Sequence, residues 1–239
     1  MHKLFISTAI LAFSLSTLSA QNLDNILKDH YKASAQEKMT KVSSITTSGI
    51  NTYAAMGIET GFTLYQSRPN KLRVEAEFQG SKIIQTYNGT TGWMYAPAMG
   101  INSPQELGTE ELKTIMSQAE FESPLWDYKS KGKSLELLGA TDDGSAHMIK
   151  VRSENGDELT LCINKKTSLI SKIISVQNVN GADAEIEVEL KDYKDVKGIP
   201  TPHYMATKMA GQVANTIKMT SIEFDKKLDA SLFEKPVVE

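Results

Sequence analysis

Few residues in this sequence could carry out chemistry, and their spacing matches no familiar active site or metal site. The histidines beyond the first few residues are His30, His147 and His203. They are far apart, and none belongs to a pair at metal-ligand spacing. The chain also lacks the Gly-x-Ser-x-Gly turn of hydrolases and a glycine-rich phosphate loop. The sequence therefore predicts a protein that is not an enzyme and needs no metal or cofactor.

The remaining reactive side chains also have simpler interpretations. Cys162 is the single cysteine, which excludes an internal disulfide. Alternation places it opposite the neighbouring leucines, and a lone thiol with no histidine nearby is predicted to be inert. Glu185, Glu187 and Glu189 share one strand face, as solvated carboxylates on an open sheet do. Asp142-Asp143-Gly144 lacks the alternating acids of a calcium loop and is interpreted as a turn.

Composition and the N-terminus indicate an exported protein. The 239-residue chain has a formal charge of −3, which disfavours nucleic acid as a partner. Residues 1–20 combine a short charged start, an apolar run and small residues at the end, as a cleavable signal peptide does. The alternative is a buried N-terminal helix. We expect a single domain over 21–239, located in the periplasm and not lipid-anchored, since no cysteine lies near the cleavage point.

The rest of the chain is dominated by strands with one apolar face. Leu72, Val74, Ala76 and Phe78 alternate with charged residues, and the same period of two returns around 159–163, 186–190 and 216–220. Asn-Gly and Asp-Gly pairs, such as Asn88-Gly89 and Asn180-Gly181, separate the runs and favour tight hairpins. The pattern predicts an antiparallel meander whose apolar face must be covered, either by curling or by helices.

Two amphipathic helices are candidates for that cover. Residues 22–39 form the first, and 107–119 form the second, with Thr109 as its expected N-cap. The second helix could be a plug of the core or a lid over a cavity, and periodicity does not separate these. Nine methionines besides Met1 would suit either core filling or an adaptable apolar binding surface.

Several motifs, in order along the chain, resemble the LolA family of periplasmic outer-membrane lipoprotein-sorting carriers. The segment Ser67-Arg68-Pro69-Asn70 resembles its Arg-Pro-Asn motif, and the segment from Tyr87 to Pro97 is similar to its Asp-Gly-x-x-x-Trp-x-Tyr-x-Pro stretch, with Asn88 in place of the aspartate. Residues 164–170 and the tail from 192 to 236 are similar to later elements of the family.

The resemblance implies a fold, a function and partners. The fold would be mainly β, a single antiparallel sheet curled into an unclosed barrel around an apolar cavity, covered by an N-terminal helix and a lid helix. The function would be to carry the acyl chains of lipoproteins or related lipids from an inner-membrane donor complex to an outer-membrane acceptor, as a monomer. Arg68 would match the arginine that holds the empty carrier shut by bonding lid residues.

On this basis we predict a binding site without catalytic residues. The lid face is predicted at Leu112, Ile115 and Met116, with Phe78→Glu or Ile115→Glu expected to weaken lipid binding without unfolding the chain. The cavity lining is predicted at Leu72, Val74, Phe78, Trp93, Leu161, Ile163 and Val188.

Three other interpretations stay open on the sequence. The same fold could serve as an envelope lipid or lipoprotein sensor without a transfer role. The sheet could have a filled core and act in an assembly, with the methionines packed tightly. A hydrolase without a recognisable motif is the third.

Overall fold

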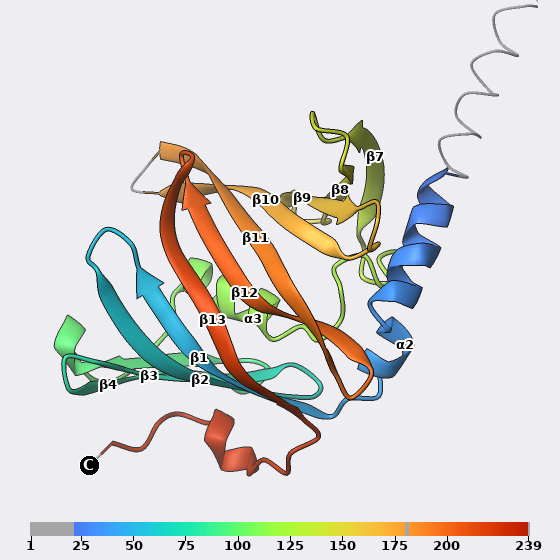
Figure 1. The fold of residues 1–239 in the computed structure, drawn as a ribbon. Coiled ribbons are helices and arrows are strands. Elements are labelled where there is room, and N and C mark those ends of the chain that lie inside the picture. Colours follow the sequence, from blue (N-terminus) through green and yellow to red (C-terminus); the bar gives the residue numbers. More distant parts are fainter. Residues whose placement is uncertain (1–21, 180–181, 239) are drawn as a thin grey trace, which may run out of the picture.

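A computed structural model describes residues 22–179 and 182–238 of the chain. The predicted signal peptide and the turn at Asn180-Gly181 lie outside the described residues. Figure 1 shows a single strongly curved sheet, with the C-terminal strands at its centre, the N-terminal helical segment (blue) at one side and a further helix (green) behind the central strands.

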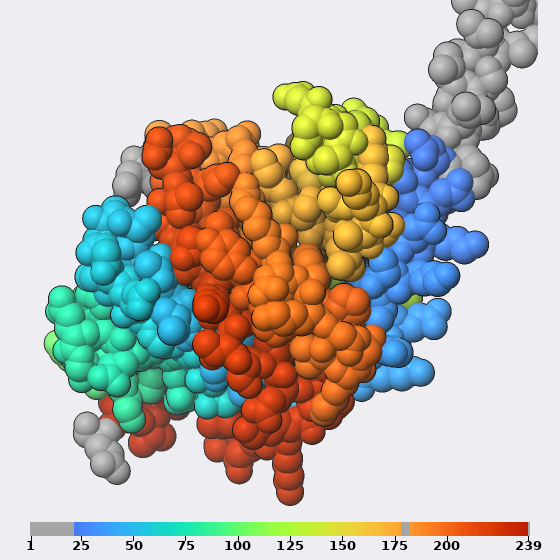
Figure 2. Space-filling view, viewed as in Figure 1, coloured from blue at the N-terminus to red at the C-terminus, as the bar shows by residue number. Residues whose placement is uncertain are grey.

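The sheet contains thirteen antiparallel strands in the order β6-β5-β4-β3-β2-β1-β13-β12-β11-β10-β9-β8-β7. Both halves are meanders, and the first strand pairs with the last, so the two halves meet at the β1–β13 ladder. Figure 2 shows the resulting outer surface, where β1–β2 lie beside β11–β13. The strands are β1 Ser44–Tyr53, β2 Ile58–Ser67, β3 Lys71–Phe78, β4 Ser81–Tyr87, β5 Gly92–Ala96, β6 Ile101–Glu106, β7 Ser134–Ala140, β8 Ala146–Arg152, β9 Glu158–Asn164, β10 Ile170–Val179, β11 Ala182–Val196, β12 Ile199–Met209 and β13 Gln212–Phe224.

The predicted N-terminal helix is broken into two pieces. Residues 22–33 are helical (α1), Ala35 adopts a left-handed conformation with φ 51°, and α2 follows at Gln36–Met39. The second helix, α3, spans Thr109–Gln118, but its N-cap is Gly108 rather than Thr109. The described part of the chain also contains two short 3-10 helices, η1 at Pro97–Met99 and η2 at Ala230–Phe233. Among the described residues, none of the helices has the length and apolarity needed to cross a bilayer.

The alternation of the strands separates charge from apolar surface. On β3, Arg73 faces outward, where its Nη1 donates to the carbonyl oxygen of Leu232 in the C-terminal segment, 2.9 Å away. On the same outward face further along the sheet, Lys172 pairs with Glu187 at 2.8 Å, and Lys208 pairs with Glu189 at 2.7 Å. The carboxylates predicted to be solvated therefore include two that form ion pairs across the convex face.

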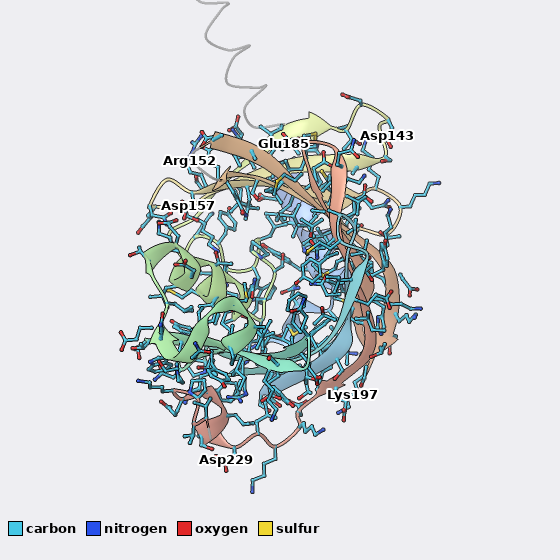
Figure 3. The ribbon with its side chains drawn as sticks, turned by 90° about the vertical axis from the view of Figure 1, so that its left-hand side faces the viewer. Asp143, Arg152, Asp157, Glu185, Lys197 and Asp229 are labelled. Atoms are coloured by element: carbon cyan, nitrogen blue, oxygen red, sulfur yellow. The ribbon has the colours of Figure 1, made fainter. Side chains whose placement is uncertain are left out.

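The apolar face is concave, and the chain covers it at both ends and at its base. Near β7–β9, Leu27 of α1 packs on Leu161 and its neighbours, whereas near β3–β4, Ile115 of α3 packs on Leu72. A third cluster at the base joins Phe121 to Phe224. In Figure 3 the sheet curls around a central opening, with α3 (green) at one side, and the labelled charged residues lie around the periphery.

The two ends of the sheet, β6 and β7, are not paired with each other in the described sheet. The barrel is therefore unclosed, as predicted. Pro104 lies within β6, where it removes a backbone donor, a common protection of edge strands.

Candidate binding site

The helices leave the middle of the concave face uncovered. The cross-strand register places residues of β2, β1, β13, β12 and β11 in one row on this face, since directly paired residues of antiparallel strands point to the same side. In this row Gly49 of β1, which has no side chain, stands between Phe62 and Met219. The large apolar side chains of the row are only half buried. We call this surface the central wall, and it consists of Phe62, Val188, Leu190, Met205, Ile217 and Met219.

The concave face carries no charged side chain over the region where its strands pair continuously. This holds for the paired, described positions of β3, β4, β2, β1, β13, β12, β10 and β9, and for β11 up to Leu190. The same strands contribute many lysines and glutamates to the convex face. An uncharged apolar surface suits acyl chains, because each buried methylene contributes about 0.8 kcal/mol and no ion must be desolvated.

Three predicted lining residues are buried under the chain's own helices. Leu72 is 0% exposed beneath α3, and Leu161 and Ile163 are equally inaccessible beside α1. They lie on the concave face, but they form the floor on which the helices pack. A ligand could touch them only after a helix has moved.

Three other predicted lining residues are accessible on the concave face. Val74 borders the α3 cluster, Phe78 lies at the end of β3 and Val188 belongs to the central wall; all are half buried. Met205, Ile217 and Met219 were not predicted as lining. Their position beside Val188 depends on pairing between β11, β12 and β13, which the sequence does not reveal.

The prediction that Trp93 lines the cavity is wrong on geometry. Trp93 pairs with Thr86, which pairs with Arg73, and that ladder is on the convex face. Its neighbour Met94 pairs with Gln85 and occupies the concave position instead. The strand is apolar on both faces, with Trp93 and Tyr95 on one side and Met94 and Ala96 on the other, and so alternation could not tell which residue faces inward.

The three lid residues have different positions on α3. Ile115 is 1% exposed and packs against Leu72, Leu112 borders the same cluster, and Met116 is 46% exposed. Ile115 is therefore a core residue, and Ile115→Glu is expected to disrupt folding rather than to report on binding. Met116 is the lid residue that a partner or cargo can reach without rearrangement.

Arg68 connects three segments at the base of the lid. Its Nε donates to the carbonyl oxygen of Val42 at 2.6 Å, and its Nη2 donates to that of Met39, the last residue of α2, at 2.9 Å. The same Nη2 forms an ion pair with Glu122 Oε1 at 2.5 Å, and the guanidinium lies 4.4 Å from the centre of the Phe121 ring. One side chain therefore holds α2 to the loop that follows α3, as a planar fork with several donors can do.

His30 forms a second connection between covering elements and sheet. The ring is 1% exposed, and its Nδ1 lies 2.9 Å from the carbonyl oxygen of Ser168, while Nε2 lies 3.1 Å from Ser123 Oγ. Because a carbonyl oxygen only accepts, Nδ1 must carry the proton, and in the neutral ring Nε2 then accepts from the Ser123 hydroxyl. The neutral ring thus ties α1 to the β9–β10 turn and to the loop after α3.

The environment of His30 predicts a loss of stability in acid. Burial lowers the pKa of His30 below its ordinary 6.5, although the Ser168 hydrogen bond opposes this. The unfolded chain therefore binds a proton at His30 near pH 6.5, whereas the folded chain binds it only at lower pH. The contribution of neutral His30 to the free energy of unfolding is thus fully present above about pH 6.5 and falls at lower pH, by at most about 1.4 kcal/mol per pH unit. Burial also lowers the pKa of His147, with the same sign.

Thermal denaturation between pH 7.5 and 5 checks this expectation. His30→Gln should reduce the dependence of the melting temperature on pH, leaving the part due to His147. An unchanged slope in His30→Gln would mean that His30 titrates alike in the folded and unfolded chains.

A separate groove lies outside the sheet, between α1, α2 and the loop around Trp126. It has a volume of about 1080 Å³, and eight of its 16 lining residues are charged, with equal numbers of each sign. This charge content makes it less suited to acyl chains than the concave face. The lining residues are Asp24, Leu27, Lys28, Tyr31, Lys32, Ala33, Ala35, Glu37, Lys38, Trp126, Asp127, Tyr128, Lys129, Asp195, Gly198 and Pro200.

The reactive residues weighed in the sequence are not brought together. His30 lies at the α1 contact, His147 on β8 and His203 on β12, and the described residues contain no group of His, Cys, Asp or Glu able to hold a metal ion. Cys162 is a buried free thiol, and burial raises its pKa above the ordinary value, which disfavours the nucleophilic thiolate.

The chain is similar to known proteins in its three-dimensional structure but not in its sequence. No family model matches the chain, and no curated protein matches it in sequence. In three dimensions it is similar to a LolA superfamily protein from Nitrosomonas europaea, with a TM-score of 0.58 and 13% identity over 89% of this chain and 97% of that one.

Two further solved structures have the same arrangement. A domain assigned to outer-membrane lipoprotein sorting from Vibrio parahaemolyticus matches with a TM-score of 0.59 and 12% identity, over 86% of this chain and 95% of that one. A DUF1329 family protein from Desulfovibrio piger matches with the same score and identity, over 87% and 97%. The chain therefore has the LolA-like fold.

Proposed function

We propose that the protein is a periplasmic carrier that binds the acyl chains of lipoproteins, or of related lipids, on its concave face and transfers them toward the outer membrane. The observation that supports this most is the central wall, a half-buried apolar surface on a face whose continuously paired, described positions carry no charged side chain. A filled core would not leave six large apolar side chains accessible on the inside of a curved sheet.

The covering elements provide a means of release. A carrier that only buried acyl chains would hold them too tightly, because about 0.8 kcal/mol per methylene accumulates quickly. In the closed state, Ile115 of α3 occupies part of the concave face, and Arg68 holds the adjoining loop in place. Cargo that displaces α3 must overcome these contacts, which lowers its net affinity and permits handover to an acceptor.

Native mass spectrometry of the mature protein, purified from its own envelope and then extracted with solvent, tests this function. We expect a bound lipid or acylated peptide that solvent extraction releases. We also expect the protein mass to be that of a chain cleaved after Ala20. A protein that is purified without lipid and takes up no fluorescent fatty-acyl probe would contradict the carrier. A stable envelope protein partner with bound lipid but no transfer to acceptor vesicles would instead indicate a sensor.

A further inference from the structure

Two amide side chains meet on the otherwise apolar concave face. Asn215 of β13 donates from its Nδ2 to Oδ1 of Asn51 on β1, at 2.9 Å, across 164 residues of sequence. Both residues lie on the concave side, because Asn51 is paired with Ile217 and Asn215 with Thr207. The pair is next to the central wall, since Thr207 is also paired with Val188.

This amide pair has unused hydrogen-bonding capacity. An asparagine offers one carbonyl oxygen and two N–H donors, so after the mutual bond the Asn51 amino group and the Asn215 carbonyl remain available. Opposite Asn51 lies Thr60, which is 6% exposed and whose Oγ1 has no hydrogen-bond partner within the described chain. A buried hydroxyl without a partner costs free energy, and each such group in a native protein calls for an explanation. Thr60 is the one of the three unpartnered buried hydroxyls in the described chain that lies on the concave face.

The positions of the two asparagines within their strands show which end of the concave face carries the polar groups. Asn51 is near the end of β1, Asn215 is near the start of β13, and the hairpins that follow and precede them form the rim opposite to the base cluster of Val42, Phe121 and Phe224. Figure 1 shows both hairpin tips at the upper side of the sheet. The polar groups are thus at the rim, and the apolar wall extends from them toward the base.

We propose that Asn51, Thr60, Thr207 and Asn215, the rim amide site, bind the uncharged ester or amide carbonyl that joins acyl chains to the polar part of the cargo. The amino group of Asn51 donates to the carbonyl oxygen, and the chains extend over the central wall. The hydroxyl of Thr60, which is buried in the empty protein, donates to the same oxygen once the cargo has parted the side chains around it. A charged head group finds no counter-charge here, since the continuously paired concave positions carry none. This inference rests on the proposed carrier function and adds the orientation of the cargo and its chemical linkage.

The test compares two probes that differ only in their carbonyls. One is a fluorescent 1,2-diacylglycerol, and the other is the dialkyl ether of the same chain length and label. The wild-type protein should bind the ester about ten-fold more tightly, which corresponds to one or two net hydrogen bonds. The double variant Asn51→Leu/Asn215→Leu should bind the ester as weakly as the ether, with ether binding unchanged.

Thr60 has a matched control on the opposite face. Thr46 is also 6% exposed with an unpartnered Oγ1, but it pairs with Tyr65 on the convex side. Thr60→Val and Thr46→Val should both raise the melting temperature, because each removes a buried hydroxyl without a partner. Only Thr60→Val should reduce the preference for the ester.

The outcomes separate this inference from the function on which it rests. If the wild-type protein binds neither probe, the carrier function fails and the rim amide site with it. If it binds both probes equally, or if the variants weaken both probes to the same extent, the rim amide site is wrong while the carrier function stands. Melting curves of all variants show whether a loss of binding reflects unfolding.

Discussion

Ile217→Glu is expected to reduce uptake of a fluorescent fatty-acyl probe by at least about 30-fold. The side chain lies in the central wall, between Asn51 on β1 and Met205 on β12. Covering a carboxylate with acyl chains costs about 2 kcal/mol or more unless it is neutralised. The continuously paired, described positions of this face offer no lysine or arginine to pair with it. In the empty protein the position is half buried, so part of the side chain is open to water, the carboxylate stays hydrated, and folding is affected less than at a fully buried position.

The adjacent residue provides the control for this substitution. Lys218 lies on the same strand, but its side chain is exposed on the convex face, paired opposite Tyr204. Lys218→Glu changes the net charge further than Ile217→Glu and should leave probe uptake unchanged. Equal uptake by Ile217→Glu and wild type, measured by fluorescence titration, would place the acyl site away from the central wall.

Arg68→Ala is expected to weaken the fold and tighten the binding of acyl probes. The substitution removes two hydrogen bonds to backbone carbonyls and the ion pair with Glu122. The free energy of unfolding should fall by about 2–4 kcal/mol, since bonds from a charged donor are among the stronger ones. The substitution destabilises the closed state more than the open state, because the Arg68 contacts are made in the closed state. The lid should therefore open more readily, which raises the affinity for the probe and slows its transfer to acceptor vesicles.

Arg73 allows stability to be separated from lid closure. It lies one strand position from Leu72 but faces outward, bonding to Leu232 and Glu75. Arg73→Ala should also lower the melting temperature, with no gain in probe affinity. If Arg68→Ala and Arg73→Ala change affinity alike, the Arg68 contacts are structural and do not control access to the concave face. Arg68→Lys should behave like Arg68→Ala in part, because one ammonium cannot reach all three acceptors.

The sequence predicted the type of fold because the relevant signals are local. The alternation from Leu72 to Phe78 gives a one-sided strand, and the same pattern recurs in the strands that follow. The spacing of Leu112 and Ile115 gives an amphipathic helix. The break at Ala35 and the cap at Gly108 were missed, since the preference of the surrounding residues for helix gave no sign of either.

The site was predicted less well because it depends on pairs that are distant in sequence. Whether Leu161 is a cavity residue or a floor depends on where α1 packs, and whether Trp93 faces inward depends on the register that connects β5 through β4 and β3 to the rest of the sheet. Asn51 and Asn215 are neighbours only because the first and last strands pair. No motif near either asparagine signals this contact.

The two unpaired edges at β6 and β7 have a consequence for the range of cargo. In a closed barrel, the number of strands and their stagger set the radius, so a larger cargo would require a barrel with a different number or stagger of strands. Here no ladder joins the ends, so small changes in twist at each of many strand pairs can add up to a wider or narrower circumference without breaking a hydrogen bond. The same chain can then bind cargo of different sizes, because the volume that the sheet encloses varies continuously instead of being fixed by the barrel geometry.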